Sequence, residues 1–132
     1  MSPTLSLDGI RVLVVDDDPD SRWALATFLS TLGAIVTEEA SADEALTTLT
    51  REHPDVLLSD IGMPRHDGLW LIAQVRGLPA HQGGETPAAA ITGNVTPEDR
   101  AIVLKAGFQY HVPKPYDPPQ VAGIVALLAL KP

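Results

Sequence analysis

The sequence predicts an α/β domain built on a parallel β-sheet, and three observations lead to this fold class. Short apolar runs alternate five times with segments of helical spacing. The clearest runs, at 10–15 (IRVLVV) and 56–58 (VLL), are continuously apolar, which is typical of strands buried on both faces. Several runs end on a polar residue that is followed by glycine, proline or a helix-capping residue. This alternation indicates βα units whose strands run parallel.

The first half of the chain is expected to hold three strands and two helices. Residues 1–9 form a polar lead-in or linker, and the folded domain is expected to cover 10–130. Asp18 suits the N-cap of the first helix, because its side chain can accept a backbone N–H, and Pro19 suits the first helical position. A weaker strand at 34–37 precedes a second helix, which begins at a capping box of Ser41 and Glu44. The third strand ends on Asp60.

The second half continues the alternation. The helix after Asp60 should turn Leu69, Ile72 and Val75 toward the core. The composition of residues 77–87 is typical of a loop. Further elements are expected at 67–76 (helix), 88–91 (strand), 96–107 (helix), 108–112 (strand) and 117–130 (helix).

Composition limits the function classes. The chain of 132 residues is 45% hydrophobic, enough for one domain with an ordinary core. Without cysteine it has no disulfide framework, thiolate metal site or cysteine nucleophile. Its net charge of −8 argues against nucleic acid or an anionic membrane as a direct partner. It has no apolar stretch near ~20 residues and no signal-peptide pattern at its start, so the expected location is the cytoplasm.

Polar residues follow four of the predicted strands. Asp16 and Asp17 follow the first strand, Asp60 ends the third, Thr92 follows the fourth and Lys114 the fifth. In an open parallel sheet the carboxyl ends of the strands meet at one edge, where ligands bind. Three converging carboxylates repel one another, and a divalent cation among them relieves that repulsion. An all-oxygen site with few protein ligands suits Mg²⁺.

A carboxylate surrounded by a divalent cation, a hydroxyl and an ammonium is suited to phosphoryl transfer. Asp60 would attack phosphorus and become an acyl phosphate, while the metal and Lys114 neutralise the phosphoryl oxygens. The hydroxyl of Thr92 would donate to one of those oxygens, and Gly93 would leave the phosphoryl group room.

Four segments in this order resemble the two-component response regulator receiver domain. They are VLVVDDD (12–18), LLSDIGMPRHDG (57–68), AAAITG (88–93) and AGFQYHVPKP (106–115). The resemblance covers 10–130 and implies a flavodoxin-like, doubly wound sheet of five parallel strands in the order 2-1-3-4-5, with helices on both faces. Chemotaxis receivers have this strand order, so the expected order follows from the resemblance and not from the spacing of the residues.

The resemblance also implies a role for each site residue. Asp60 matches the phosphoacceptor, and Asp16, Asp17 and the backbone carbonyl of Gly62 match the ligands of Mg²⁺ or Mn²⁺. The remaining matches are the switch positions Thr92 and His111, the lysine Lys114 and a cis bond before Pro115. The implied phosphodonor is a histidine kinase or a histidine phosphotransfer domain, and the domain is no enzyme beyond its own phosphorylation and dephosphorylation.

His111 is the main departure from the family pattern. Many stand-alone regulators carry Tyr or Phe at this position, and the segment GFQYHVPKP (107–115) is similar to receivers attached to hybrid histidine kinases. Signalling by rotation of an aromatic ring is therefore not expected in its usual form.

A second function class accounts for part of the pattern. Residues 16–18 (DDD) satisfy the Asp-x-Asp signature of haloacid-dehalogenase-type phosphohydrolases, in which Asp16 would be the nucleophile and Thr92 and Lys114 later motifs. The chain offers neither an acidic pair after Lys114 nor a cap domain, and this interpretation leaves Asp60 without a task. The residue labelled by acetyl phosphate or trapped by BeF₃⁻, Asp60 or Asp16, distinguishes the two classes.

Some surface features remain outside the site. His53, His66 and His81 are expected to be solvated, and Trp70 partly buried. The last helix should turn Val121 and its apolar neighbours to the sheet, yet its other face is also apolar. That face is predicted to contact a second copy of the chain or an adjoining domain.

Overall fold

The sheet and its helices follow the predicted alternation. A computed structural model describes residues 5–93 and 96–130. Its strands are β1 (Arg11–Val15), β2 (Ile35–Glu39), β3 (Val56–Asp60), β4 (Ala88–Thr92) and β5 (Tyr110–Pro113). Its helices are α1 (Pro19–Thr31), α2 (Ala42–Glu52), α3 (Gly68–Arg76), α4 (Pro97–Ala106) and α5 (Pro118–Ala129), with a 3₁₀ turn at Ala80–Gln82.

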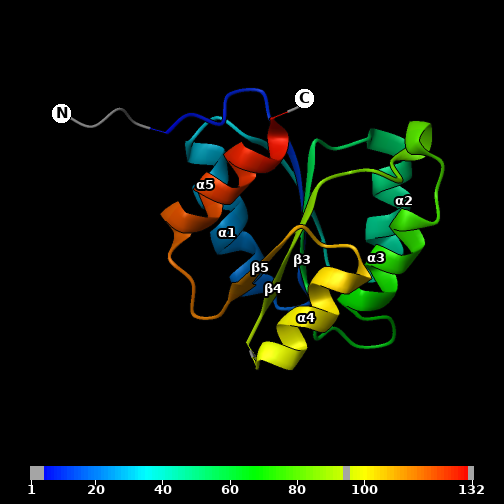
Figure 1. The fold of residues 1–132 in the computed structure, drawn as a ribbon. Helices are drawn as coiled ribbons and strands as arrows, with labels where there is room; N and C mark the ends of the chain where they lie inside the picture. The colour runs from blue at the N-terminus through cyan, green and yellow to red at the C-terminus, as the bar shows by residue number, and fades with distance from the viewer. Residues whose placement is uncertain (1–4, 94–95, 131–132) are drawn as a thin grey trace.

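The five strands are parallel and lie in the order β2-β1-β3-β4-β5, which confirms the predicted fold class. Helices α1 and α5 cover one face of the sheet, and α2, α3 and α4 cover the other (Figure 1). Among the described residues, no helix combines the length and apolar character needed to cross a membrane.

Each central strand contributes to two hydrophobic cores. In β1, Val12 and Val14 pack with α1 and α5, whereas Leu13 and Val15 pack with the helices of the opposite face. Strands β3 and β4 alternate in the same way. Because side chains of a strand alternate between faces and both faces are covered, these strands are continuously apolar.

The helix starts follow the capping signals. Asp18 accepts the Asp20 N–H at the start of α1, and Thr96 forms a capping box with Asp99 at the start of α4. At α2 the Ser41 hydroxyl accepts the Glu44 N–H, as predicted, while the Glu44 carboxylate contacts the Ser41 hydroxyl. Such caps satisfy backbone groups that the first helical turn leaves unpaired.

Several segments differ from the prediction, and among them β5 begins at Tyr110 instead of 108. Strand β2 continues to Glu39 instead of 37, because an edge strand tolerates the polar residues Glu38 and Glu39 at its end. Within the lead-in, Leu7 is fully buried against the α1–α5 core. The loop at 77–87 contains a 3₁₀ turn, and the Arg76 guanidinium donates to the carbonyls of Gly84 and Thr86 at 3.0 and 2.7 Å.

Candidate functional site

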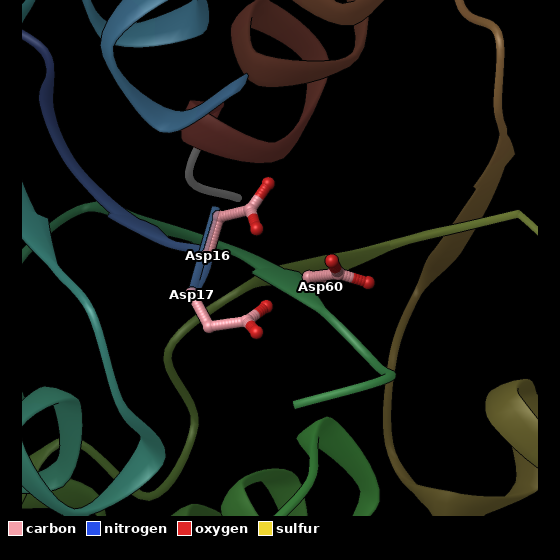
Figure 2. Close-up of side chains that lie close together, drawn as sticks. All are labelled: Asp16, Asp17 and Asp60. Atoms are coloured by element: carbon pink, nitrogen blue, oxygen red, sulfur yellow. The ribbon is translucent and has the colours of Figure 1, made fainter. Parts of the chain in front are cut away.

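Three carboxylates meet at the carboxyl edge of the sheet. Asp16 and Asp17 follow β1, and Asp60 is the last residue of the neighbouring strand β3. One carboxylate oxygen from each lies within 4.8 Å of the others (Figure 2). The side chains of Asp16 and Asp60 are only 11% and 13% exposed, whereas Asp17 is exposed. Because β1 and β3 are adjacent and in register, the fold forces these like charges together.

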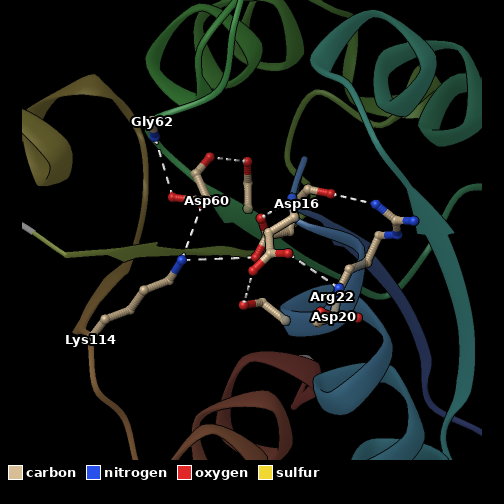
Figure 3. A network of polar contacts seen from close by, with 9 residues as sticks. Asp16, Asp20, Arg22, Asp60, Gly62 and Lys114 are labelled. Carbon is tan, nitrogen blue, oxygen red and sulfur yellow. Dashed lines mark hydrogen bonds and ion pairs between the residues drawn. The ribbon is translucent and has the colours of Figure 1, made fainter.

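Lys114 is the cation of this cluster. Its Nζ lies 3.1 Å from Oδ2 of Asp60 and 3.8 Å from Oδ2 of Asp16 (Figure 3). Partial burial acts to lower the pKa of Lys114, but the hydrogen bond and charge of Asp60, with the charge of Asp16, outweigh it and raise the pKa. The ammonium therefore stays charged and compensates part of the carboxylate repulsion.

Backbone contacts join Lys114 to the end of β4. The Lys114 N–H donates to the Thr92 carbonyl at 2.8 Å, so the lysine and the threonine enter the site from bonded strands. The Lys114–Pro115 peptide bond is cis. On the other side of the site, the Gly62 N–H donates to Oδ1 of Asp60 at 3.3 Å.

Asp16 is held by contacts that the sequence did not indicate. Its carboxylate accepts the Asp18 N–H at 2.9 Å, and its backbone carbonyl accepts from the Arg22 guanidinium at 2.8 Å. Figure 3 shows Arg22 beside Asp16. Arg22 also pairs with Glu38 at 3.3 Å, so α1, β1 and β2 are joined beside the carboxylates. Burial, with the nearby charge of Asp60, raises the pKa of Asp16. No periodicity or motif marks Arg22; only its position in the first turn of α1 hints at this contact.

Comparison with known proteins identifies the family. The family model described as "Response regulator receiver domain" matches residues 12–126. The chain belongs to this family. It is therefore a receiver domain of two-component signalling.

Relatives of several kinds match this chain in sequence. The response regulator MprA of Mycobacterium tuberculosis is 36% identical over 108 residues, which are 82% of this chain and 45% of that protein. The sensor histidine kinase RcsC of Escherichia coli is 34% identical over 108 residues, 82% of this chain and 11% of the kinase. This receiver thus spans about half the length of MprA and a small part of RcsC. A 14.6 kDa protein of Leptolyngbya boryana, whose name describes it as uncharacterized, is 46% identical over 91% of this chain and 90% of its own.

Solved structures agree with the assignment. The receiver domain of the Francisella response regulator 1452 superposes with a TM-score of 0.84 at 26% identity, covering 92% of this chain and 97% of that one. The receiver domain of a Syntrophus aciditrophicus signal transduction histidine kinase gives a TM-score of 0.82 at 26% identity, covering 92% and 90% of the two chains. The fold is therefore common to receivers of regulators and of kinases.

The donor set of this receiver suits a hard divalent cation. Asp16, Asp17 and Asp60 present carboxylate oxygens, and the described residues near them include no thiolate or imidazole ligand in the cluster. Exposed Asp17 leaves the cluster open to water, which Mg²⁺ retains in its coordination shell. At Gly62 an added Cβ would meet nothing within 4 Å, so the backbone beside the cluster is accessible. The residues present therefore fit Mg²⁺ or Mn²⁺.

His111 lies on β5, which β4 separates from the strand β3 that bears Asp60. It is half-buried on β5 opposite Ala90, and its Nε2 is buried without a hydrogen-bond partner among the described residues. Burial, aided by the positive charge of Arg100, lowers the pKa of His111, and the charge of Asp99 opposes this only in part. The ring is therefore neutral in the folded receiver at neutral pH.

Acidification should destabilise this receiver partly through His111. Its pKa is lowered below the ordinary value of 6.5 on folding, so its contribution to stability is complete above that value and is lost as the pH falls. Between about pH 7.5 and about pH 5, the free energy of unfolding should fall more in the wild type than in His111→Gln. Denaturant unfolding at both values measures the difference. His81→Gln, at an exposed position, should behave as the wild type; an equal pH dependence in His111→Gln would contradict the prediction.

Proposed function

We propose that this receiver accepts a phosphoryl group on Asp60 in a Mg²⁺-dependent reaction, within a two-component phosphorelay. The observation that carries the proposal is the 3.1 Å contact of Lys114 with Asp60 inside a cluster of three carboxylates. The donor would be the phosphohistidine of a histidine kinase or phosphotransfer protein, and the reaction would occur in the cytoplasm. Similarity to receivers within RcsC and within the hybrid signal transduction histidine kinase D of Dictyostelium discoideum supports a donor of this kind.

Each residue has a chemical task in this proposal. An oxygen of Asp60 forms a bond to phosphorus while the bond from phosphorus to the donor histidine nitrogen breaks, and the imidazole leaves as it takes up a proton. Lys114 neutralises charge on the phosphoryl oxygens, and the Thr92 hydroxyl donates to one of them. Mg²⁺ or Mn²⁺, held by Asp16, Asp17, Asp60 and the Gly62 carbonyl, would supply further charge neutralisation on the same oxygens.

The site favours Asp60 over Asp16 as the nucleophile. The ammonium of Lys114 is closer to Asp60 than to Asp16, at 3.1 against 3.8 Å. Membership of the receiver family, in place of the phosphohydrolase family, supports the same choice.

The proposal is tested by locating the phosphoryl group. The purified protein is incubated with acetyl phosphate, or with a phosphorylated histidine kinase, in the presence of Mg²⁺. We expect a single base-labile phosphate, and borohydride reduction of the acyl phosphate followed by peptide mass spectrometry should place it on Asp60. Label on Asp16 would support the phosphohydrolase mechanism instead, and no label with Mg²⁺ present would contradict the proposal.

The signal would leave the site through Thr92. Its hydroxyl would contact the phosphoryl group only in the phosphorylated state, and this differential contact can shift the conformational equilibrium. His111 is smaller than Tyr and more polar than Phe, and it can form hydrogen bonds in more than one position. We therefore propose a modest change on the surface formed by α4, β5 and α5.

The outer face of α5 is proposed to contact a second copy of the chain or an adjoining domain. The helix has no charged residue, and its Leu127 is 54% exposed; Leu130, which follows the last helical residue, is 72% exposed. We expect concentration-dependent self-association that Leu127→Glu abolishes, because a buried unpaired carboxylate is strongly disfavoured. Sedimentation velocity with and without BeF₃⁻ and Mg²⁺ measures this. Ile35→Glu, at a residue 58% exposed on β2, is the matched control. A strict monomer that dimerises tightly only with BeF₃⁻ and Mg²⁺ would contradict the predicted self-association. It would also contradict the modest change proposed for the surface formed by α4, β5 and α5.

A further inference from the structure

The connection from β3 to α3 carries Gly62 and is anchored mainly at its two ends. The N–H groups of Met63 and Gly68 both donate to the Ile61 carbonyl at 2.9 Å, and the Met63 side chain is buried. Between these anchors, Pro64 and Arg65 are exposed, and Arg65 has a φ of 67°, in the left-handed region. Such a backbone persists only where the surrounding structure holds it.

His66 connects this segment to the two helices beside it. Its Nδ1 lies 2.7 Å from Oδ1 of Asp43, which is in the first turn of α2. Because an ionised carboxylate can only accept, the Nδ1–H of the imidazole donates this bond. The opposite contact is aromatic: the ring stacks on Trp70 of α3 with centroids 3.8 Å apart and planes inclined by 8°. The sequence predicts a solvated His66, and the structure instead joins this side chain to two helices.

Both contacts of His66 are made to helices and not to β3, the strand that bears Asp60. Asp43 is 23 residues away from His66 in sequence, and Trp70 lies one helical turn beyond it. Helices α2 and α3 lie side by side on one face of the sheet (Figure 1). A side chain that bonds to one and stacks on the other therefore fixes the segment between β3 and α3 relative to both helices.

We propose that His66 is a positioning residue: through Asp43 and Trp70 it holds the 61–67 segment so that the Gly62 carbonyl is placed for the metal. The inference rests on the proposed function, in which Gly62 is a ligand. Gly62 itself is exposed, and an added Cβ there would touch nothing within 4 Å, so no side-chain packing fixes this residue directly. Apart from the hydrogen bond of its N–H to Oδ1 of Asp60, at 3.3 Å, its position depends on the anchors of the segment around it.

The first arm of the test needs no metal. Amide hydrogen exchange of Met63 and Gly68 is measured in wild type, His66→Ala, His66→Gln and His81→Ala, without Mg²⁺. We expect faster exchange in His66→Ala, partial recovery in His66→Gln, whose amide can still donate to Asp43, and no change in the exposed control His81→Ala. Asp43→Ala removes the hydrogen bond but keeps the stacking on Trp70, so its exchange should lie between those of the wild type and His66→Ala. The double variant should exchange no faster than His66→Ala. Unchanged exchange in His66→Ala would overturn the inference.

The second arm measures Mg²⁺ affinity by isothermal titration calorimetry. His66→Ala should bind Mg²⁺ about tenfold more weakly than the wild type. This is the low end of the effect of removing a residue that orients a metal ligand, because His66 acts on Gly62 only through the backbone. The variant His66→Gln should recover part of the lost Mg²⁺ affinity while its melting temperature equals that of His66→Ala. Faster exchange with wild-type affinity would overturn the link to Gly62. Absence of Mg²⁺ binding in the wild type would instead reject the proposed function. The hydrogen-exchange measurement would still decide whether His66 holds the 61–67 segment.

Discussion

Phosphorylation is expected to disappear in Asp60→Asn. The asparagine amide has nearly the shape of the carboxylate but lacks the anionic oxygen that attacks phosphorus. No other carboxylate can replace it well, because Asp16 lies farther from the Lys114 ammonium, at 3.8 against 3.1 Å, and Asp17 is exposed. With a phosphodonor and Mg²⁺, incorporation measured on Phos-tag gels or by mass spectrometry should fall to background.

Two further variants make this result specific. Asp20→Asn, at an exposed position on α1, should be phosphorylated as the wild type. Asp16→Asn should lower the rate by weakening the metal site, but the remaining label should still map to Asp60. Label that persists in Asp60→Asn would disprove the assignment of the phosphoacceptor.

Lys114→Met should slow phosphorylation on the order of 100-fold, as loss of one preorganised charge-stabilising donor typically does. In the part of the chain that the structure describes, Lys114 is the only Lys or Arg paired with the Asp60 carboxylate. Methionine keeps a similar length without charge, so the variant isolates the electrostatic contribution. Stopped-flow measurement of phosphorylation at saturating Mg²⁺ gives the rate.

The same variant should also be less stable without Mg²⁺. Asp16, Asp17 and Asp60 remain together, but the ammonium that lies 3.1 and 3.8 Å from two of them is lost. Added Mg²⁺ should therefore raise the melting temperature of Lys114→Met more than that of the wild type. Lys105→Met, on the exposed side of α4, is the control. An unchanged phosphorylation rate in Lys114→Met would show that this lysine does not act on the phosphoryl group.

The sequence by itself was sufficient for the α/β fold class and for the membership of the carboxylate cluster, whereas the strand order was expected from the family resemblance. Both the fold class and the cluster depend on patterns that are local along the chain. Buried parallel strands must be apolar on both faces, so 10–15 and 56–58 were recognisable from composition alone. Helix starts such as Asp18 and Thr96 satisfy backbone groups within a few residues. Since parallel strands end at a common edge, the residues that follow them converge without any knowledge of their exact distances.

Only the tertiary structure decided which side chains support that edge. The Arg22–Glu38 pair and the His66–Asp43 bond join residues of different elements, 16 and 23 positions apart. Burial of Leu7 depends likewise on where the chain passes the α1–α5 core. Residue type and periodicity specify which face of an element is buried, but not the rotation and spacing of two elements packed against each other. Contacts of one polar side chain with another depend on that spacing to within about 1 Å, and so they appear only once the whole domain is packed.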